Sequence, residues 1–303
     1  MARRTDSIAG LAFSSDAVSV AQYIPAEREV ANIGIQPVDE HAADLWESAA
    51  PGLKQLVSAT KLAGGNVVCS LPGEHAIIRT LCLDNDEPDV AEALEWEFCQ
   101  HVIGSRDEFV FDFEKLAAVP TAGVEQYLVV GYRTETVERA ARILRLSKLN
   151  PIIVDLDIFA LINVYEANYA DLAAAPAICV LADEAVSKCV LTAGGTFVDM
   201  EIVNHGAASQ NAGTWAAAVE NGIAKLLACS ASAPRRDALP VLLSGDLFSQ
   251  PDFAGEATKA VKNAEILYPF RTIKCGAGMS DQDLRKYSPQ LAVAVGLALR
   301  GVA

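Results

Sequence analysis

The segment IAGLAFSSDAVSV, residues 8–20, has the pattern of a strand, a tight polar turn and a second strand. Turns of this kind bind phosphate through backbone N–H groups, preferably at glycine, where a ligand can approach closely. This turn consists of Ser14, Ser15 and Asp16 and contains no glycine. A phosphate charge about 4 Å from the Asp16 carboxylate would meet a repulsion on the order of 4 kcal/mol at an effective dielectric near 20. The residues therefore predict a turn that keeps the shape of a hairpin without its ligand.

The other side chains that could do chemistry do not converge in the sequence. Four histidines are scattered along the chain, at positions 41, 75, 101 and 205, and the seven cysteines include no C-x-x-C pair. No nucleophile-elbow, zinc-protease or P-loop pattern occurs. Most cysteines lie in apolar runs, and we interpret them as reduced core residues of a cytosolic protein. We therefore predict no catalytic residue and no metal site.

Asp155 and Asp157, in the segment VDLD, are two residues apart, a spacing that puts both side chains on one face of a strand. One interpretation is a paired carboxylate site. We favour a role as polar residues between subdomains, and we include both among the candidates for contact with a partner.

A helix predicted over residues 88–102 carries Glu92 and Glu95 beside Trp96. Its apolar residues recur at four-residue spacing, so one side of the helix is acidic. This side could hold an apolar peptide with a basic end. The alternative is a solvated acidic face with one core aromatic residue. Arg133 completes the candidate partner site, because it ends the strand VEQYLVVGYR, which could pair with an incoming strand if it has a free edge.

Length and charge limit the class of protein. The chain has 303 residues, of which 51% are hydrophobic, and this suggests two domains or one large divided domain. The formal net charge of −15 disfavours nucleic acid and anionic membrane surfaces as partners. The N-terminus lacks a signal-peptide pattern, and the longest apolar runs are about ten residues, whereas a membrane-spanning helix needs about 20. We expect a cytoplasmic protein that reaches a membrane only through a partner.

The order of the predicted elements suggests an internal duplication. Residues 8–35 and 177–203 each predict two strands joined by a tight turn, with a third strand after them. Between the two copies, the acidic break DNDEPDV opens a helix-strand-strand-helix-strand unit. The segment SPQLAVAVGLALRG predicts a C-terminal helix capped by Gly301.

Four segments resemble the PilM family, FtsA-like proteins of type IV pilus assembly. They are GLAFSSDAVSVAQ, ALEWEFCQHVIGSRDEFVFDFEKL, VVGYRTETVERAARILRLSKLNPIIVDLDIFAL and PQLAVAVGLALRG. The third is the most specific, because family members have a strand, a helix ending in GLxP and a VDxxxxAL segment at this spacing. The resemblance covers nearly the whole chain in order, and GspL-type secretion adaptors are relatives with the same scaffold.

The resemblance implies an α/β, actin-like (ribonuclease-H-like duplicated) fold. Its first half would comprise residues 1–83 and 153–176, with a small α+β subdomain inserted at 84–152. Its second half would be residues 177–303, with a reduced fourth subdomain, a vestigial lid, at about 207–239. Family members bind ATP with magnesium between the halves. They also hold the N-terminal cytoplasmic tail of a bitopic membrane protein, PilN, in a groove beside the inserted subdomain.

The turns that align with the family's nucleotide-binding turns depart from its pattern. The first turn, approximately D-I-G-S-S-x-x-K in the family, has Ala12 at the aspartate and Ser19 at the lysine. In the second turn, Glu184 replaces a glycine, and in the third, Asp246 replaces one. The residues of this region, if a nucleotide uses it, are Ser14, Ser15, Asp16, Asp183, Gly245 and Asp246.

These observations predict a PilM-like adaptor and pseudo-ATPase that binds the tail of a PilN-like protein, peripheral to the inner membrane. The main alternative is a functional ATP-binding protein whose nucleotide state controls partner binding. An actin-like filament former is a third hypothesis, and a homo-oligomer is compatible with each. A sugar-kinase type of enzyme is least favoured, since no catalytic base is apparent. No cofactor is firmly predicted, and ATP with magnesium belongs to the alternative.

Overall fold

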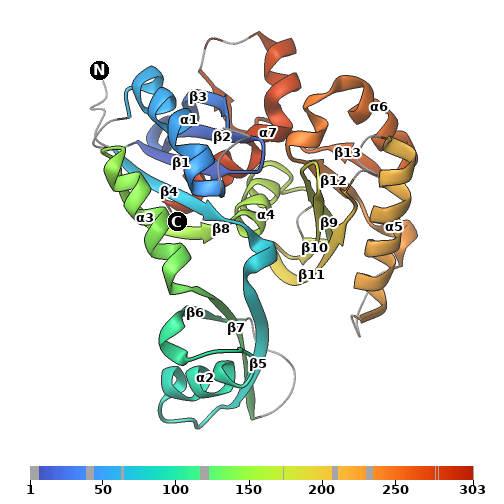
Figure 1. Ribbon diagram of the computed structural model, residues 1–303. Helices are drawn as coiled ribbons and strands as arrows, with labels where there is room; N and C mark the ends of the chain where they lie inside the picture. The colour runs from blue at the N-terminus through green and yellow to red at the C-terminus, as the bar shows by residue number, and fades with distance from the viewer. Residues whose placement is uncertain are drawn as a thin grey trace. The chain divides into compact units, whose positions relative to one another are not determined.

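The computed structural model describes residues 7–38, 44–62, 65–116, 123–172, 174–206, 211–229, 235–276, 278 and 280–302. The chain divides into a large unit, Met1–Gly73 with Ile143–Ala303, and a small unit, Glu74–Arg142 (Figure 1). The small unit therefore begins and ends about ten residues earlier than the insertion expected at 84–152. Strand pairing accounts for the difference, because the strand before residue 84 belongs to the small unit's sheet and the strand after residue 150 to the large unit's sheet.

The first half of the large unit is a six-stranded sheet with the order β14-β3-β2-β1-β4-β8. Its strands are β1 (Ile8–Phe13), β2 (Ala17–Ile24), β3 (Glu29–Pro37), β4 (Asn66–Leu71), β8 (Asn150–Leu156) and β14 (Lys274–Cys275). Strand β2 runs antiparallel to both β1 and β3, whereas β4 pairs parallel with β1, and β8 parallel with β4. The parallel strands require crossover connections, and helices supply them.

The second half repeats this plan in a five-stranded sheet with the order β11-β10-β9-β12-β13. Its strands are β9 (Ala177–Ala182), β10 (Val186–Ala193), β11 (Thr196–Asn204), β12 (Val241–Ser244) and β13 (Ala264–Ile266). Strands β9, β10 and β11 form an antiparallel unit, and β12 pairs parallel with β9. The two three-stranded units expected from the sequence are therefore both present, with the same order and directions.

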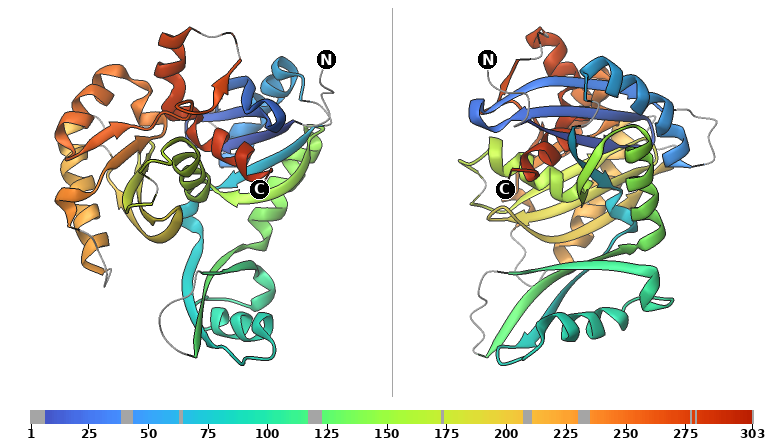
Figure 2. Two further views of the ribbon diagram at one scale, coloured as in Figure 1. Left: turned by 180° about the vertical axis from the view of Figure 1, so that it is seen from behind. Right: turned by 90° about the vertical axis from the view of Figure 1, so that its left-hand side faces the viewer.

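Helices fill the space between and around the two sheets (Figure 2). They are α1 (Leu45–Thr60), α3 (Thr134–Leu146), α4 (Asp157–Asn168), α5 (Ala212–Cys229), α6 (Pro251–Ala260) and α7 (Asp281–Arg300). Helix α7 packs on β1, β2 and β4 and also contacts α4 and β12. A Cβ on Gly296 of α7 would lie 1.8 Å from the carbonyl oxygen of Ala160 in α4, so only glycine permits this close approach. Of the helices in the described part of the chain, none is long and apolar enough to cross a membrane.

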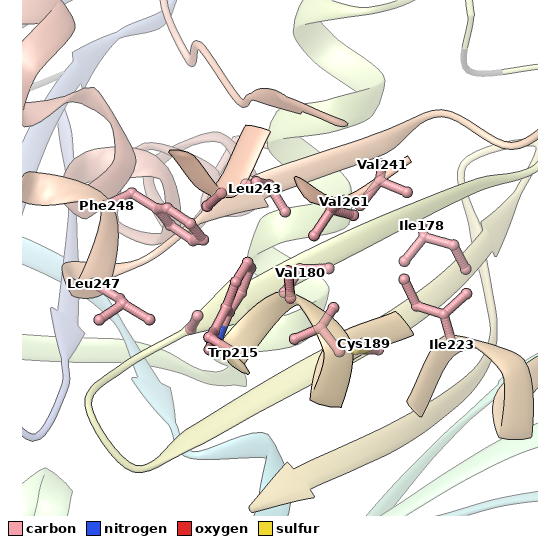
Figure 3. Packing of buried hydrophobic residues seen from close by; sticks show 14 of the residues in the cluster. Ile178, Val180, Cys189, Trp215, Ile223, Val241, Leu243, Leu247, Phe248 and Val261 are labelled. Carbon is pink, nitrogen blue, oxygen red and sulfur yellow. The ribbon is translucent and has the colours of Figure 1, made fainter. Parts of the chain in front are cut away.

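The core of the second half lies where α5 covers its sheet (Figure 3). Trp215 and Val219 of α5 are fully buried there and pack with Val180, Leu243 and Phe248. Helix α5 falls within the segment expected to be a vestigial lid, about 207–239, but it is a core layer of the second half. The ends of that segment, 207–210 and 230–234, lie outside the described residues.

The small unit is a three-stranded antiparallel sheet with one covering helix. The sheet has the order β5 (Ile77–Asp84), β7 (Val124–Arg133), β6 (Phe109–Lys115), and the helix is α2 (Val90–Cys99). Leu94 and Phe98 of α2 are fully or almost fully buried against this sheet. The helix begins after Asp89, whose side chain accepts a hydrogen bond from the N–H of Glu92, a common N-cap arrangement.

Candidate functional site

The first and second halves each present one tight turn at the ends of matching hairpins. In the first hairpin Phe13 pairs with Val18, and in the second Ala182 pairs with Ser187. The N–H of Ser14 donates to the carbonyl of Ala17 at 3.0 Å, and the equivalent bond in the second turn has the same length. The two turns therefore match residue by residue, with Ser14 equivalent to residue 183 and Asp16 equivalent to residue 185.

Each turn uses its own first side chain to bind its backbone N–H groups. The Ser14 hydroxyl accepts hydrogen bonds from the N–H of Ala17 at 3.0 Å and of Asp16 at 3.4 Å. The Asp183 carboxylate accepts from the N–H of Ala185 at 2.9 Å and of Val186 at 2.8 Å. Phosphate-binding turns direct such N–H groups at their ligand. Here these four N–H groups bind side chains of the protein itself.

The third candidate turn follows β12 and packs against the second hairpin. Gly245 has a φ of 113°, and a Cβ there would lie 2.1 Å from the carbonyl oxygen of Ala182. The site therefore requires glycine both for its backbone conformation and for this close approach. The next residue, Asp246, accepts a hydrogen bond from the side-chain amide of Gln290 in α7 at 2.8 Å.

The three turns bring four carboxylates of the large unit near one another: Asp16, Asp183, Glu184 and Asp246. Burial, and after it the charges of the other three carboxylates, raise the pKa of Asp16 to about 6, although a hydrogen bond from Ser15 lowers it. Burial also raises the pKa of Asp246, although hydrogen bonds from Ser14 and Gln290 lower it. The four carboxylates therefore make the junction of the two halves acidic.

A buried ion pair joins the halves beside these turns. Lys188 of β10 donates to Asp157, and both side chains are almost fully buried. The second carboxylate oxygen of Asp157 accepts the N–H of Gly73 at 2.9 Å. Asp157 was expected on a strand with Asp155, but β8 ends one residue earlier and Asp157 is the first residue of α4. Because it is interior, its role is to bind Lys188 and Gly73 rather than to face a partner.

Asp155 remains on β8 and lies 3.7 Å from the guanidinium of Arg300 in α7. The sequence analysis did not identify Lys188 as a functional residue. Its position could have indicated one, because it is the only charged residue in the apolar strand VSKCVLTA. A lysine inside a buried strand requires a buried partner.

Among the candidates in the small unit, Trp96 is 64% exposed, so the alternative interpretation of a core aromatic residue is wrong. Position explains this exposure, because Trp96 lies on the side of α2 opposite to the buried Leu94 and Phe98. Glu92, one turn before Trp96, is exposed on the same side.

The other two small-unit candidates bind within the unit. Glu95 pairs with Arg106. Arg133 pairs with Glu108 at 2.9 Å and lies over the ring of Phe109. We expected that the strand VEQYLVVGYR could pair with an incoming strand if it had a free edge. It has no free edge, because this strand, β7, is the central strand of its sheet and pairs with β5 on one side and β6 on the other.

The cysteines divide into two groups. Burial raises the pKa of the Cys69, Cys179 and Cys189 thiols to about 12, as expected for core residues. Cys82 and Cys229 are exposed, so the expectation that most cysteines are core residues is too broad. Within the described ranges, no group of three histidine, cysteine, aspartate or glutamate side chains could hold a metal ion.

Known proteins share both the sequence pattern and the fold of this chain. The family model of the type IV pilus assembly protein PilM matches residues 27–198, more than half of the chain. The PilM-PilN type IV pilus biogenesis complex is similar in structure, with a TM-score of 0.78, 21% identity and coverage of 98% of each chain. The ethanolamine utilization protein EutJ from Carboxydothermus hydrogenoformans has a TM-score of 0.50 at 11% identity, over 96% of this chain and 88% of that one.

The cytoplasmic domain of EpsL, an inner membrane component of the Vibrio cholerae type II secretion system, has a TM-score of 0.49 at 11% identity over 92% of each chain. No curated protein matches the sequence.

Two halves built on matching three-stranded units, with helices α4 and α7 between them, define an actin-like α/β protein. The match over residues 27–198 narrows this class. The chain belongs to the family of the type IV pilus assembly protein PilM.

Proposed function

We propose that this type IV pilus assembly protein acts as an adaptor that binds the cytoplasmic tail of a PilN-like membrane protein and does not use ATP. One observation carries the proposal: two backbone N–H groups in each hairpin turn bind a side chain of the same turn, Ser14 or Asp183. A polyphosphate would have to displace these bonds before the turns could bind it.

Charge opposes the nucleotide as well. ATP is a polyanion, and four carboxylates are collected at the three turns where a nucleotide would bind. Each unit of like charge at about 4 Å costs on the order of 4 kcal/mol at an effective dielectric near 20, more than a typical hydrogen bond contributes. The residues present therefore do not fit ATP, and the adaptor function needs no step through it.

The small unit supplies the surface for the tail. It contains 15 acidic and 6 basic residues, so it carries −9 of the chain's net charge of −15. On this acidic background, α2 exposes Trp96 next to Glu92. Exposed tryptophan is typical of binding hot spots, and it attracts cations over its ring. We expect the tail to be short and apolar, with at least one arginine or lysine near Trp96. PilN is the partner of PilM in the similar complex, and this motivates the choice of a PilN-like tail.

Fluorescence of Trp96 tests the proposal, because the other two tryptophans, Trp46 and Trp215, are buried. A synthetic tail peptide from a PilN-like protein of the same gene cluster should change the quenching of Trp96 by iodide and bind with a micromolar dissociation constant. The affinity should fall about tenfold in Glu92→Lys and stay within about twofold in Glu114→Lys, a control charge reversal at an exposed position of β6.

The same titration repeated with saturating Mg-ATP separates the proposal from its alternative. An adaptor that ignores nucleotide gives the same affinity in both buffers. A change of tenfold or more would show that nucleotide state controls partner binding, and the alternative would replace the proposal.

A further inference from the structure

The large unit has a cationic side that the net charge of the chain conceals. Residues 45–73 and 143–154 contain four basic residues and one acidic residue, Glu47 in the first turn of α1, although the whole chain has 39 acidic and 24 basic ones. The four are Lys54, Lys61, Arg145 and Lys148, and all are exposed. No carboxylate in the described part of the chain forms a salt bridge with any of them. Leu146, which lies between Arg145 and Lys148 in the sequence, is 75% exposed.

The topology brings these residues to one side of the six-stranded sheet. Helix α1 connects the parallel strands β3 and β4, and α3 leads into β8, which continues the sheet in the same direction. Right-handed crossovers that progress in one direction place their helices on the same face. Figures 1 and 2 show α1 and the C-terminal end of α3 on this side, with α7 across the sheet from them.

The C-terminal ends of α1 and α3 are tied to each other through the strands that follow. The N–H of Asn150 donates to the carbonyl of Gly65 at 3.0 Å, and its side chain donates to Asn66 at 2.7 Å. Lys61 and Lys148 closely follow their helices, and both have left-handed backbones, with φ of 56° and 62°. Glycine is the usual residue in this conformation, so a lysine at both positions is an unfavourable backbone choice that adds positive charge to this side.

We propose that this cationic face, Lys54, Lys61, Arg145, Leu146 and Lys148, lies on the anionic headgroups of a lipid bilayer. Four exposed cations and one exposed leucine on the same side of the sheet match the interfacial pattern of basic stems and a shallow apolar anchor. A bilayer also requires no groove, and these side chains lie on a helix-covered outer face. The choice of a membrane rests partly on the proposed function, since a membrane-anchored tail would bring the protein close to a bilayer.

The acidic remainder of the protein limits the strength of this contact. An anionic surface repels the net negative charge of the rest of the chain, so binding is weak and sensitive to salt. The net charge of the whole chain disfavours binding to anionic membranes. That expectation assumes an even distribution of charge over the surface, which this face does not have.

Vesicle flotation of the full-length chain, without nucleotide or tail peptide, tests the proposal. The protein should float with vesicles of phosphatidylglycerol and phosphatidylethanolamine at low salt, but not with phosphatidylcholine vesicles or in high salt. Each juxtaposed cation contributes about fivefold to partitioning. The pair Arg145→Glu with Lys148→Glu should therefore lower the partition coefficient at least about tenfold, and the neutral pair Arg145→Gln with Lys148→Gln should do nearly the same.

The matched control reverses Lys225 and Lys259, which lie on α5 and α6 of the second half, and gives the same net charge. It should lower partitioning less than about threefold. Leu146→Ser should weaken binding a few-fold without altering its salt dependence. Absence of flotation at low salt, or an equal loss in the control pair, would overturn the proposal. Because the assay contains no tail peptide, that failure would leave the adaptor function intact, and failure of tail binding would leave this contact intact.

Discussion

The two hairpins share a backbone and differ in the polar residues placed on it. Their strands pair in the same register, and their turns close with the same hydrogen bond. The first turn is capped by a hydroxyl, Ser14, and the second by a carboxylate, Asp183. The shape of the turn therefore needs only a side-chain acceptor at its first position. The resemblance implies that backbone N–H groups of these turns bind phosphate. In this chain, N–H groups of the turns bind the side chains of Ser14 and Asp183 instead.

The two hairpins differ more in polarity at the second residue pair from the turn. Ser19 pairs with Ala12 in the first hairpin, and Lys188 pairs with Leu181 in the second. Ser19 lies at the position where the resemblance predicts a lysine. Lys188 occupies the matching position in the second half. There it binds Asp157 and so links the second sheet to the start of α4. The cation of this region thus joins the two halves of the protein.

The largest expected effect comes from breaking this ion pair. Lys188→Met leaves Asp157 charged and buried, so the free energy of unfolding should fall by about 3–5 kcal/mol. Ser19→Ala, at the matching position, should cost no more than about 1 kcal/mol. Urea denaturation at pH 7 measures both, and adding Asp157→Asn to Lys188→Met should recover part of the loss. Equal effects at the two positions would show that the hairpins do not differ in this way.

A smaller effect is expected from removing the turn caps. Asp183→Ala deletes two charge-assisted hydrogen bonds to backbone N–H groups, and we expect a loss of about 1–2 kcal/mol. Ser14→Ala should cost about 0.5–1 kcal/mol, since its bonds are neutral and one is long. Thermal unfolding followed by circular dichroism gives the ranking. The reverse ranking would contradict the interpretation that the carboxylate is the stronger cap.

The smallest effect concerns Asp16, whose match in the second turn is an alanine, Ala185. Burial and neighbouring carboxylates raise the pKa of Asp16 to about 6, above its ordinary value of 3.8. The folded state therefore binds this proton more tightly than the unfolded state, and the resulting stability is present below about pH 4 and lost as the pH rises through 6. Asp16→Ala should raise stability at pH 7 by on the order of 1 kcal/mol, after allowance for partial solvent screening. It should also flatten the pH dependence between 4 and 6. If the pH dependence of stability is unchanged in the variant, groups other than Asp16 cause it.

The sequence predicted the elements that repeat or alternate. Both three-stranded units follow from their strand patterns and turns, and α2 follows from its four-residue apolar spacing. Helix α4 was missed because it is buried on nearly every side, so DIFALINVYEAN shows little helical periodicity. The boundaries of the small unit were missed because they depend on which strands pair, β5 with β7 and β8 with β4, and such pairing is not local in sequence.

The candidate site was predictable only in part. The resemblance named the three turns, and the structure brings their carboxylates close enough to raise the pKa of Asp16 and Asp246. The sequence alone could not show that Ser14 and Asp183 bind the backbone of their own turns, because that depends on the orientation of the side chain. Nor could it show that Lys188 reaches Asp157, since these residues lie in different halves. The exposure of Trp96 depended on which side of α2 meets the small sheet, a choice that the acidic flanking residues left open.

Isothermal titration calorimetry with Mg-ATP tests the central claim, that the turns are closed by the chain itself and repel a polyanion. We expect no saturable binding to the unmodified protein at pH 7.5, and at most a weak gain in Asp16→Ser, in which one like charge is removed. The opposite result is equally clear. A dissociation constant in the low micromolar range or tighter, lost in Ser15→Tyr at the exposed tip of the first turn, would show that the turns open to bind nucleotide and would contradict the account.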